Sequence, residues 1–505
     1  MPRFGHLQSF TRHTQPLRHR AAGWALAAAG MLPVMTACSS LPTIVPDMGR
    51  PRAATQLSGQ HGLLSATRSR QVLEALKGSN PQANQLDRHL ALEQAISDSP
   101  LTTGNRVRLL EDGPATYRAM LAAIAAARDH INLESYIFED DEAGKQFSDA
   151  LLAQQARGVQ VNLIYDGVGT LGTRPEFFAR LSDGGIKLLE FNPVNPLAAK
   201  AGWDVNQRDH RKLLVVDGRT AFLGGINISG VYSGGSFSRG SGSRASAKVG
   251  NMPGNTPGNT PGNMPGNTPG KQPAKTQPWR DTHLQIDGPV VAEFQKLFIE
   301  TWTKQKGEAL AARAYYPALT AQGSEVIHAI GSSPDDEYSL MYATLISAID
   351  NAETEVLLTN AYFVPDPQLR GSLKAAVGRG VDVKIILPGS TDSALVFHAG
   401  RSYYDELLQA GVKIFERRDV MLHAKTALVD GVWSTVGSTN LDWRSFLHNQ
   451  ELNAVVLGEA FGNQMRAAFE ADLARAEPIT LRDWRRRTID LRAKEVFARM
   501  WQYWL

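Results

Sequence analysis

The sequence predicts an α/β fold built from two similar halves, each with helices layered on a β-sheet. Two observations lead to this prediction. From about residue 105 to residue 476 the chain runs twice through the same order of segments. Within each run, amphipathic stretches with a helical period alternate with short apolar stretches that are typical of buried strands. Because such alternation gives layered packing, we expect two pseudo-symmetric α/β/α domains in one chain.

The matching segments follow one another in the same order in both halves. Each half has a helix and a strand, then an amphipathic helix with a glycine turn and a β-rich run, and then a helix that ends at glycine before another strand. These segments are 116–138, 150–167 and 177–191 in the first half, and 339–366, 372–389 and 403–417 in the second. A repeat of this size indicates duplication of a whole domain rather than a solenoid of short units.

A polar motif, His-x-Lys-x4-Asp, occurs once in each half. Its residues are His210, Lys212 and Asp217, and then His423, Lys425 and Asp430. An apolar run follows each lysine, so His and Lys hold alternating positions at a strand and point to one face. There they could present a ring nitrogen and an ammonium to one phosphate. One copy alone would favour a structural histidine, but two copies with matching flanks favour chemistry.

Each motif is followed by further polar residues at matching distances. A glycine-containing turn carries Asn227 in the first half and Asn440 in the second. Glu451 follows His423 by 28 residues, and Asp281 follows His210 by 25 once a 46-residue insert is set aside. A carboxylate that accepts a hydrogen bond from one ring nitrogen fixes the tautomer and makes the other nitrogen a better base or nucleophile. We therefore expect Asp281 and Glu451 to orient the histidines.

The insert covers residues 233–278 and interrupts the first half. It is rich in Ser and Gly and contains five successive Asn-(Met/Thr)-Pro-Gly units. This composition offers too little apolar surface to offset the entropy of ordering, so we expect a disordered loop, with a tether to a partner as the alternative. The expected domains are a signal at 1–38, a tether and helical segment at 39–104, catalytic domains at 105–320 and 321–476, and a basic, aromatic C-terminal helix at 477–505.

The first 38 residues have the pattern of a bacterial export signal. Four arginines precede an apolar run at 21–37, which ends in small residues before Cys38. The run is shorter than a comfortable membrane span. Met35 to Cys38 resembles a lipoprotein cleavage box, with Met where Leu is commonest. We expect an exported, membrane-associated lipoprotein anchored at Cys38 and favour the outer membrane, because Ser39 rather than Asp follows. A short uncleaved anchor and a buried thiol are the alternatives.

Composition excludes several other classes of site. The net charge is +3, too mild to indicate a nucleic-acid partner, and a single cysteine rules out an intramolecular disulfide and a Cys-rich zinc site. The acidic run Asp140, Asp141 and Glu142 has no histidine or second carboxylate group at ligand spacing nearby, so a solvated turn is the better interpretation than a metal site. We expect no metal and no cofactor.

These motifs, together with the segments NAYFVPD and Trp279 to Pro289, resemble the phospholipase D superfamily, and within it the bacterial cardiolipin synthases and related proteins. The resemblance covers roughly residues 106–476. It implies that both histidines meet one phosphodiester between the halves. One attacks phosphorus to form a phosphohistidine, and the other protonates the leaving alcohol and then deprotonates the incoming one. By position, His210 is expected as nucleophile and His423 as general acid and base.

The other motif residues have expected roles as well. The non-bridging oxygens of the substrate phosphate would be bound by the two lysines and two asparagines, Lys212, Lys425, Asn227 and Asn440. Asp217 and Asp430 are expected to hold the turn behind each strand rather than touch substrate. The implied partners are a phospholipid substrate, a membrane surface and an alcohol or phospholipid acceptor. Cardiolipin synthesis from phosphatidylglycerol is the first hypothesis, and a hydrolytic phospholipase D, a secreted endonuclease and a non-catalytic binding lipoprotein are the alternatives. The C-terminal segment would meet the membrane interface or pack on the second domain.

Overall fold

Seven strands of the first half pair in the order β3–β11–β9–β8–β4–β5–β6. The strands around β8 pair antiparallel, whereas β4, β5 and β6 run parallel. Their bounds are Thr102–Leu110 (β3), His130–Ser135 (β4), Gln160–Asp166 (β5), Lys187–Phe191 (β6), Lys212–Val216 (β8), Thr220–Gly224 (β9) and His283–Asp287 (β11). The computed structural model describes residues 56–77, 83–96, 99–195, 197, 203–233 and 277–505.

The sheet of the second half repeats this order with its own strands, β12–β19–β18–β17–β13–β14–β15, and adds β20 at the edge. Their bounds are Glu325–Ser332 (β12), Glu355–Asn360 (β13), Asp382–Pro388 (β14), Lys413–Arg417 (β15), Lys425–Val429 (β17), Trp433–Gly437 (β18), Asn449–Leu457 (β19) and Ala476–Ile479 (β20). Strands β12 and β3 pair antiparallel and join the two sheets, which confirms the predicted pair of layered α/β halves.

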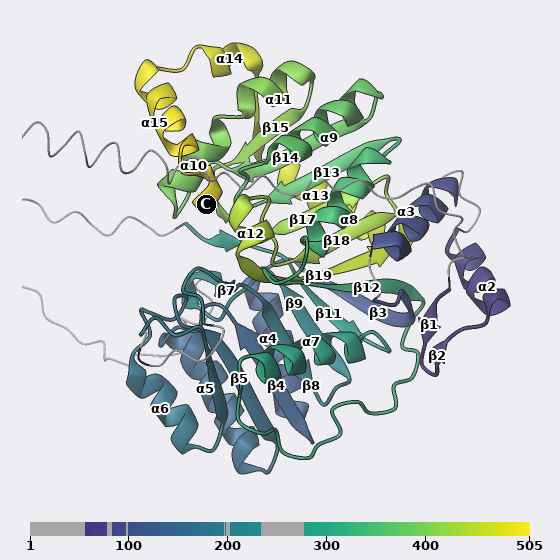
Figure 1. Ribbon diagram of the computed structural model, residues 1–505, viewed down its shortest axis with the longest axis vertical. Coiled ribbons are helices and arrows are strands. Elements are labelled where there is room, and N and C mark those ends of the chain that lie inside the picture. The colour runs from purple at the N-terminus through teal and green to yellow at the C-terminus, as the bar shows by residue number, and fades with distance from the viewer. Residues whose placement is uncertain (1–55, 78–82, 97–98, 196, 198–202, 234–276) are drawn as a thin grey trace, which may run out of the picture. The chain divides into compact units, whose positions relative to one another are not determined.

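The helices also correspond between the halves (Figure 1). Those of the first half are Gly113–Ala126 (α4), Glu142–Ala156 (α5), Pro175–Asp183 (α6) and Val291–Lys304 (α7). Those of the second are Leu340–Asp350 (α8), Pro367–Gly378 (α9), Ala394–Arg401 (α10), Tyr404–Ala410 (α11), Trp443–Leu447 (α12) and Glu459–Leu473 (α13). Several begin at an aspartate whose carboxylate accepts backbone N–H bonds, as Asp112 does for α4 and Asp366 for α9.

One hydrophobic core extends through both halves. It combines side chains of α7, such as Phe294 and Trp302, with side chains of α13, such as Phe461 and Phe469, and with residues of both sheets. A second core belongs to the first half and lies around α4 and α5, with Tyr117 and Phe147 completely buried in it. The shared core fixes the halves against each other, because separating them would expose this apolar surface.

The N-terminal part contains two helices within the region 39–104, where the sequence predicted a tether and a helical segment. They are Ala66–Lys77 (α2) and Ala83–Ile96 (α3), and two short strands, Ser58–Gly59 (β1) and Gly62–Leu63 (β2), precede them. Helix α3 packs on the second half through Glu93, whose carboxylate accepts hydrogen bonds from Trp433 Nε1 and His328 Nδ1, both at 2.7 Å. Gly78 and Pro81, which disfavour a continuous helix, lie between α2 and α3 in the sequence and outside the described residues.

The C-terminal part is also more divided than predicted. Instead of a single helix, strand β20 is followed by Leu481–Arg485 (α14), Ile489–Arg499 (α15) and a 3₁₀ turn at Gln502–Trp504 (η4). Trp484 of α14 is buried and packs on Tyr404. This segment therefore packs on the second half, as one of the two alternatives predicted, although α15 keeps apolar side chains exposed.

The predicted export signal at 1–38, including Cys38, and residues 234–276 of the insert lie outside the described residues. The ends of the insert are part of the fold, since Ser233 is buried and Gln277 donates a hydrogen bond to the carbonyl of Arg418. The domain limits remain predictions. Within the described ranges, none of the helices has the length and apolar character that a membrane crossing requires.

Candidate active site

The two motifs lie at equivalent places in the two sheets. His210 and His423 directly precede the central strands β8 and β17, and both side chains are largely buried. Each lysine begins its strand and donates to the carbonyl of its own histidine, Lys212 at 2.5 Å from His210 O and Lys425 to His423 O. The predicted alternation of His and Lys is confirmed, because both side chains enter the same buried region.

Each histidine is held by the opposite half. The short strand Arg208–Asp209 (β7) pairs with β19, and His210 N donates to Gln450 O at 3.0 Å. In the same way Met421–Leu422 (β16) pairs with Trp279–Arg280 (β10), and His423 N donates to Arg280 O at 2.8 Å. The chain thus exchanges a pair of short strands across the boundary between the halves, directly before each histidine.

The orienting carboxylates are exchanged as well. His210 Nδ1 lies 3.1 Å from both carboxylate oxygens of Glu451, and His423 Nδ1 lies 2.7 Å from Asp281 Oδ2. The sequence offsets select the two carboxylates but do not say which histidine each one contacts. Both carboxylates contact a histidine as predicted, but each serves the histidine of the other half, because each follows the strand segment that pairs across the boundary.

The two carboxylates have different surroundings. Glu451 also accepts hydrogen bonds from the Ser438 hydroxyl and from Asn449 Nδ2, the latter at 3.2 Å. At the position equivalent to Ser438 the first half has Gly225, and a Cβ there would lie 2.2 Å from Asp281 Oδ1. The glycine is therefore needed for Asp281 to fit, whereas the longer Glu451 has room for a serine partner.

Asp217 and Asp430 hold turns, as predicted. Both have positive φ angles, 53° and 51°, at the end of their strands. Asp217 accepts N–H bonds from residues 128, 129 and 130, and Asp430 accepts N–H bonds from residues 353, 354 and 355. Each carboxylate thus satisfies three backbone donors where the chain enters β4 or β13. This geometry accounts for the third residue of each motif without contact to a substrate.

Asn227 and Asn440 are both buried, but their amides are used differently. Asn227 Oδ1 accepts from Ile137 N at 3.1 Å, and its Nδ2 donates to the Tyr232 hydroxyl at 3.3 Å. Asn440 Oδ1 has no hydrogen-bond partner among the described residues. To bind a phosphate oxygen, Asn227 Nδ2 would have to give up its hydrogen bond to the Tyr232 hydroxyl and donate to the ligand instead. Phosphate binding by Asn227 therefore stays a prediction.

The electrostatic surroundings lower the pKa of both histidines. Burial is the largest cause for each. For His210, the cations Lys212 and Lys425 and then His423 add to burial, and they hold its pKa well below the usual range. For His423, Lys425 also lowers the pKa but Asp281 opposes it. Since Lys425 and His423 act on His210, the two motifs share one electrostatic site.

The carboxylates and lysines respond in opposite ways to the same burial. Burial raises the pKa of Glu451 to about 7, and Lys212 offsets it only in part. Burial would also raise the pKa of Asp281, but Lys425 and His423 outweigh it and hold the pKa below the ordinary value. Burial lowers the pKa of Lys212 to about 7 and that of Lys425 to about 8. An anionic ligand would favour the charged form of both lysines.

Aromatic side chains that the sequence interpretation missed surround the histidines. Tyr136 contacts His210 edge-on, with ring centroids 5.1 Å apart. Trp279 lies 5.1 Å, Tyr232 6.0 Å and Tyr362 6.2 Å from the ring of His423. The signal for Tyr136 and Tyr362 was present, because each follows the matching strand of its half in the segments SYIF and AYFV.

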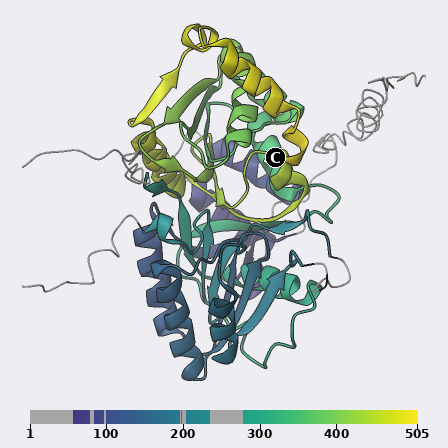
Figure 2. The ribbon, with the colours of Figure 1, turned by 90° about the vertical axis from the view of Figure 1, so that its left-hand side faces the viewer.

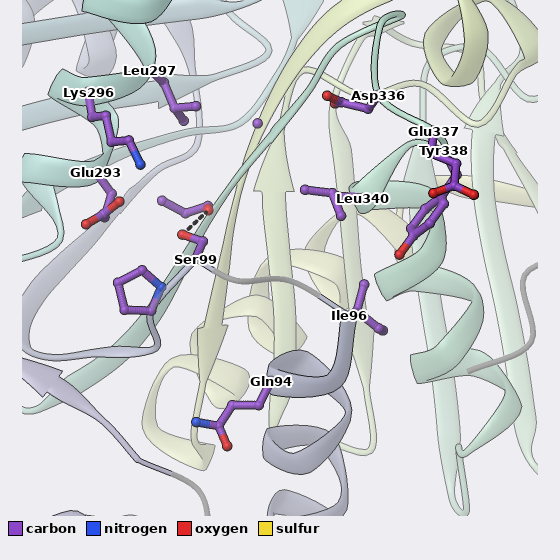
Figure 3. Close-up of a pocket in the computed structure, with 13 residues that line it drawn as sticks. Gln94, Ile96, Ser99, Glu293, Lys296, Leu297, Asp336, Glu337, Tyr338 and Leu340 are labelled. Atoms are coloured by element: carbon purple, nitrogen blue, oxygen red, sulfur yellow. Dashed lines mark hydrogen bonds between the residues drawn. The ribbon is translucent and has the colours of Figure 1, made fainter. Parts of the chain in front are cut away.

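Other features of the molecule lie apart from the motifs. Asp141 accepts from Gly144 N as the cap of α5, so the acidic run is part of a helix start, and no cluster of three or more potential metal ligands occurs in the described residues. A cavity of about 720 Å³ lies between α3, α7 and the segment before α8 (Figure 3). Glu293, Lys296 and Asp336 line it, and none of the motif residues does.

A duplicated α/β frame that brings two His-Lys pairs and two exchanged carboxylates into one buried site defines the phospholipase D class of proteins. The family model described as "Cardiolipin synthase, PLD-like domain" matches residues 120–232 and 345–473. The chain belongs to this cardiolipin synthase family within the phospholipase D superfamily.

Similar proteins of known name support this membership. Cardiolipin synthase A of Pseudomonas entomophila is 33% identical over 412 residues, which cover 80% of this chain and 76% of that protein. The cardiolipin synthase of Alkalihalophilus pseudofirmus is 31% identical over 412 residues, with 81% of this chain and 74% of that protein covered. The crystal structure of phosphatidylserine synthase from Haemophilus influenzae is 12% identical with a TM-score of 0.57, covering 83% of this chain and all of that chain, and shows the fold alone.

Proposed function

We propose that this chain is a phosphatidyltransferase that makes cardiolipin from phosphatidylglycerol and a second phospholipid. The observation that carries the proposal is the single buried site with two His-carboxylate pairs and two lysines, in a chain about 30% identical to cardiolipin synthases. Two imidazoles can divide nucleophilic and acid-base work on one phosphodiester. The fold and the relatives agree with this chemistry over most of the chain.

The reaction proceeds in two balanced steps. In the first, the free ring nitrogen of His210 forms a bond to phosphorus while the bond to the headgroup oxygen breaks, and His423 gives its proton to that oxygen so that glycerol leaves. In the second, His423 takes the proton from the hydroxyl of the acceptor lipid, whose oxygen attacks phosphorus and releases His210. If water replaces the acceptor, the same steps give phosphatidic acid.

The carboxylates support this division of roles between the histidines. A nucleophile must be neutral, and burial, Lys212 and Lys425 all hold the pKa of His210 low. A general acid must carry a proton. Burial and Lys425 lower the pKa of His423, but Asp281, whose carboxylate lies 2.7 Å from its Nδ1, opposes them and makes a proton on this ring easier to hold than one on His210. Glu451, with a pKa near 7, gives weaker charge support to His210. The electrostatics therefore favour the same assignment as the order of the motifs.

The phosphoryl oxygens would be bound by the lysines and asparagines of the site. Lys212 and Lys425 lie beside the histidines, and their ammonium groups would neutralise the charge that develops on the non-bridging oxygens. The buried side chains of Asn440 and Asn227 would add amide donors. All of these roles, like those of His210 and His423, are proposals that mutation can test.

The decisive experiment incubates the purified protein with vesicles of labelled phosphatidylglycerol and separates the products. Cardiolipin and free glycerol would support the transferase, phosphatidic acid would favour the hydrolase, and DNA cleavage without lipid turnover would favour the endonuclease. Samples quenched in alkaline detergent, in which a phosphohistidine persists, should contain the phosphorus label on the protein when His210 is present and none in His210→Ala. A matched control is His398→Ala, since His398 lies on α10 and in neither motif. Full turnover by His210→Ala would contradict the assignment.

We further propose that the protein is exported and anchored to a membrane through acylation of Cys38. The support is the sequence before Cys38, because these residues lie outside the described part of the chain. Mass spectrometry of the mature N-terminus tests it. A diacylglyceryl cysteine at position 38 is the expected result, and an unmodified residue there would contradict lipidation.

A further inference from the structure

An apolar stripe runs along the exposed face of α15 and continues into η4. Of the thirteen large apolar side chains that are exposed in the described residues, six lie between positions 489 and 504, with exposed fractions from 40% to 83%. They are Ile489, Val496, Phe497, Met500, Trp501 and Trp504. Positions 489, 493, 496 and 500 follow the i, i+4, i+7, i+11 spacing of one helix face. Their gathering on one short segment distinguishes them from scattered surface residues.

The stripe is not needed to hold α15 in place. The opposite face of the helix carries Glu495 and Ala498, which are buried, and Arg487 binds the Glu495 carboxylate at 3.0 Å. Arg487 also lies over the ring of Trp484, 3.8 Å from its centre. The helix is therefore docked through its other side, and the exposed apolar face adds nothing to the stability of the chain described.

Cationic residues flank the stripe. Residues 481–505 contain seven Lys or Arg and three Asp or Glu, a net charge of +4 that exceeds the +3 of the entire chain. Arg492 and Arg499 lie along one border of the stripe, and both are exposed. An apolar face with aromatic rings and a basic border is complementary to the surface of an anionic bilayer, where the rings enter the boundary and the cations meet the phosphates.

The stripe lies beside the strand that leads to the active site. The ring of Trp504 stacks on His448, with centroids 6.3 Å apart, and the C-terminal carbonyl of Leu505 accepts from Arg444 N at 2.8 Å. His448 in turn accepts from Arg208 N through its carbonyl at 3.2 Å, two residues before His210. Figure 1 places α15, the C-terminus and α12 near one another, above the first half. Figure 2 shows the C-terminus above the first half from a second direction.

A further exposed apolar residue extends this surface towards the first half. Val205 is 49% exposed and lies next to Asn206, whose side-chain oxygen and carbonyl accept hydrogen bonds from Arg444. A surface that held the stripe would therefore also meet the loop that enters β7. This arrangement would bring the headgroups of a bilayer to the residues that precede His210.

We propose that the stripe of α15 and η4 docks the enzyme on an anionic phospholipid surface and delivers lipid headgroups to the site beside His210. The proposal rests on the lipid-transfer function above. It assigns to the C-terminal segment a contact that the N-terminal anchor does not provide, because a tether limits distance but sets no orientation. Docking through the stripe fixes which face of the folded body meets the bilayer.

The test uses the chain's single cysteine. In a Cys38→Ser background, which also removes acylation, Val496→Cys is labelled with an environment-sensitive fluorophore. Leu63→Cys is the matched control, because Val496 is 66% and Leu63 69% exposed, and Figure 1 shows β2 and α15 at opposite sides of the body. On adding phosphatidylglycerol-containing vesicles, emission at 496 should rise about twofold or more and shift to the blue, while emission at 63 stays unchanged. An unchanged signal at 496, or equal changes at both positions, would overturn the docking.

A kinetic comparison separates this proposal from the function on which it rests. Val496→Ser with Met500→Ser should lower turnover of vesicle phosphatidylglycerol about tenfold or more, yet leave turnover of a short-chain phosphatidylglycerol below its micelle concentration unchanged. Equal loss on both substrates, or a stripe that mediates self-association in sedimentation instead of vesicle contact, would contradict it. If position 496 responds to vesicles but no lipid is turned over, docking stands and the transferase proposal fails.

Discussion

Each orienting carboxylate contacts the histidine of the opposite half, so a substitution at one carboxylate should affect the role of one histidine. We use Asp281→Asn to predict which chemical step depends on His423. Asp281→Asn keeps the shape of the side chain but removes the charge that lies 2.7 Å from His423 Nδ1. Both groups are buried, so the lost ion pair should cost about 2–4 kcal/mol of stabilisation of the protonated ring, or about 30- to 1000-fold in rate. Because His423 is the proposed general acid, the loss should fall on protonation of the leaving group.

The assay compares two donors in the first step. Phosphatidylglycerol releases glycerol, a poor leaving group that needs a proton, whereas a phosphatidyl ester of p-nitrophenol releases a stable anion that does not. Asp281→Asn should therefore slow the first step on phosphatidylglycerol by about 30- to 1000-fold. The burst of p-nitrophenol should stay close to that of the unmodified protein. Rapid-mixing measurement of the burst isolates this step from the later activation of the acceptor.

Glu451→Gln should behave differently, because Glu451 contacts the proposed nucleophile. It should slow both donors, and by only about tenfold, since a carboxylate with a pKa near 7 is only partly ionised at neutral pH. Asp366→Asn, a buried aspartate that caps α9, is the matched control and should change neither burst rate. The reverse pattern, with Glu451→Gln sparing the p-nitrophenol ester, would refute the exchanged pairing as the basis of the two roles.

Three further predictions concern pH and stability. The value of kcat/KM should fall as pH rises, because His423, whose pKa lies below its usual range, loses the proton that it must donate, and because Lys212 and Lys425 lose theirs above about 7 to 8. Protonation of His210, whose pKa lies well below its usual range, should reduce kcat/KM at acid pH. Initial rates from acid to alkaline pH check both limbs. Asp430→Ala should lower the free energy of unfolding by about 3 kcal/mol in urea titrations, because three backbone donors lose their acceptor, and Asp430→Asn should lose less. Glu93→Ala should destabilise the protein by a similar amount, measured the same way, because it leaves two buried donors unpaired and loosens α3.

The parts of the fold that were predictable are those fixed by local sequence. Periodicity and spacing along the chain predict three of these features. They are the alternation of His and Lys at the start of β8 and β17, the paired order of helices and strands, and the turn role of Asp217. Repetition made these predictions firmer, because an error in one half would have to recur in the other. Repetition also pointed to Asp281 and Glu451 as candidate site residues, because each follows the histidine of its half by nearly the same number of residues.

The parts that were not predictable depend on how the halves meet. Which histidine Asp281 contacts is set by the pairing of β10 with β16, a contact between segments about 140 residues apart whose two-residue strands leave no periodic signal. The aromatic wall around His423 has the same origin, since Trp279 comes from β10 and Tyr362 from the second half. The C-terminal segment was divided more finely than its basic, aromatic composition indicated, because β20 completes a sheet edge that only the tertiary fold defines.

A duplicated frame would by itself give two equivalent histidines, and equivalent histidines cannot hold opposite protonation states for one reaction step. The symmetry is broken in the carboxylates. Asp281 fits only because Gly225 leaves space for it, and the nearby cations keep its charge. For Glu451, burial outweighs Lys212 and raises the pKa to about 7. The difference leaves the pKa of His423 less depressed than that of His210, although burial and nearby cations lower both. The proposed division of acid-base labour would therefore follow from two carboxylates that lie on the halves opposite to the histidines they contact.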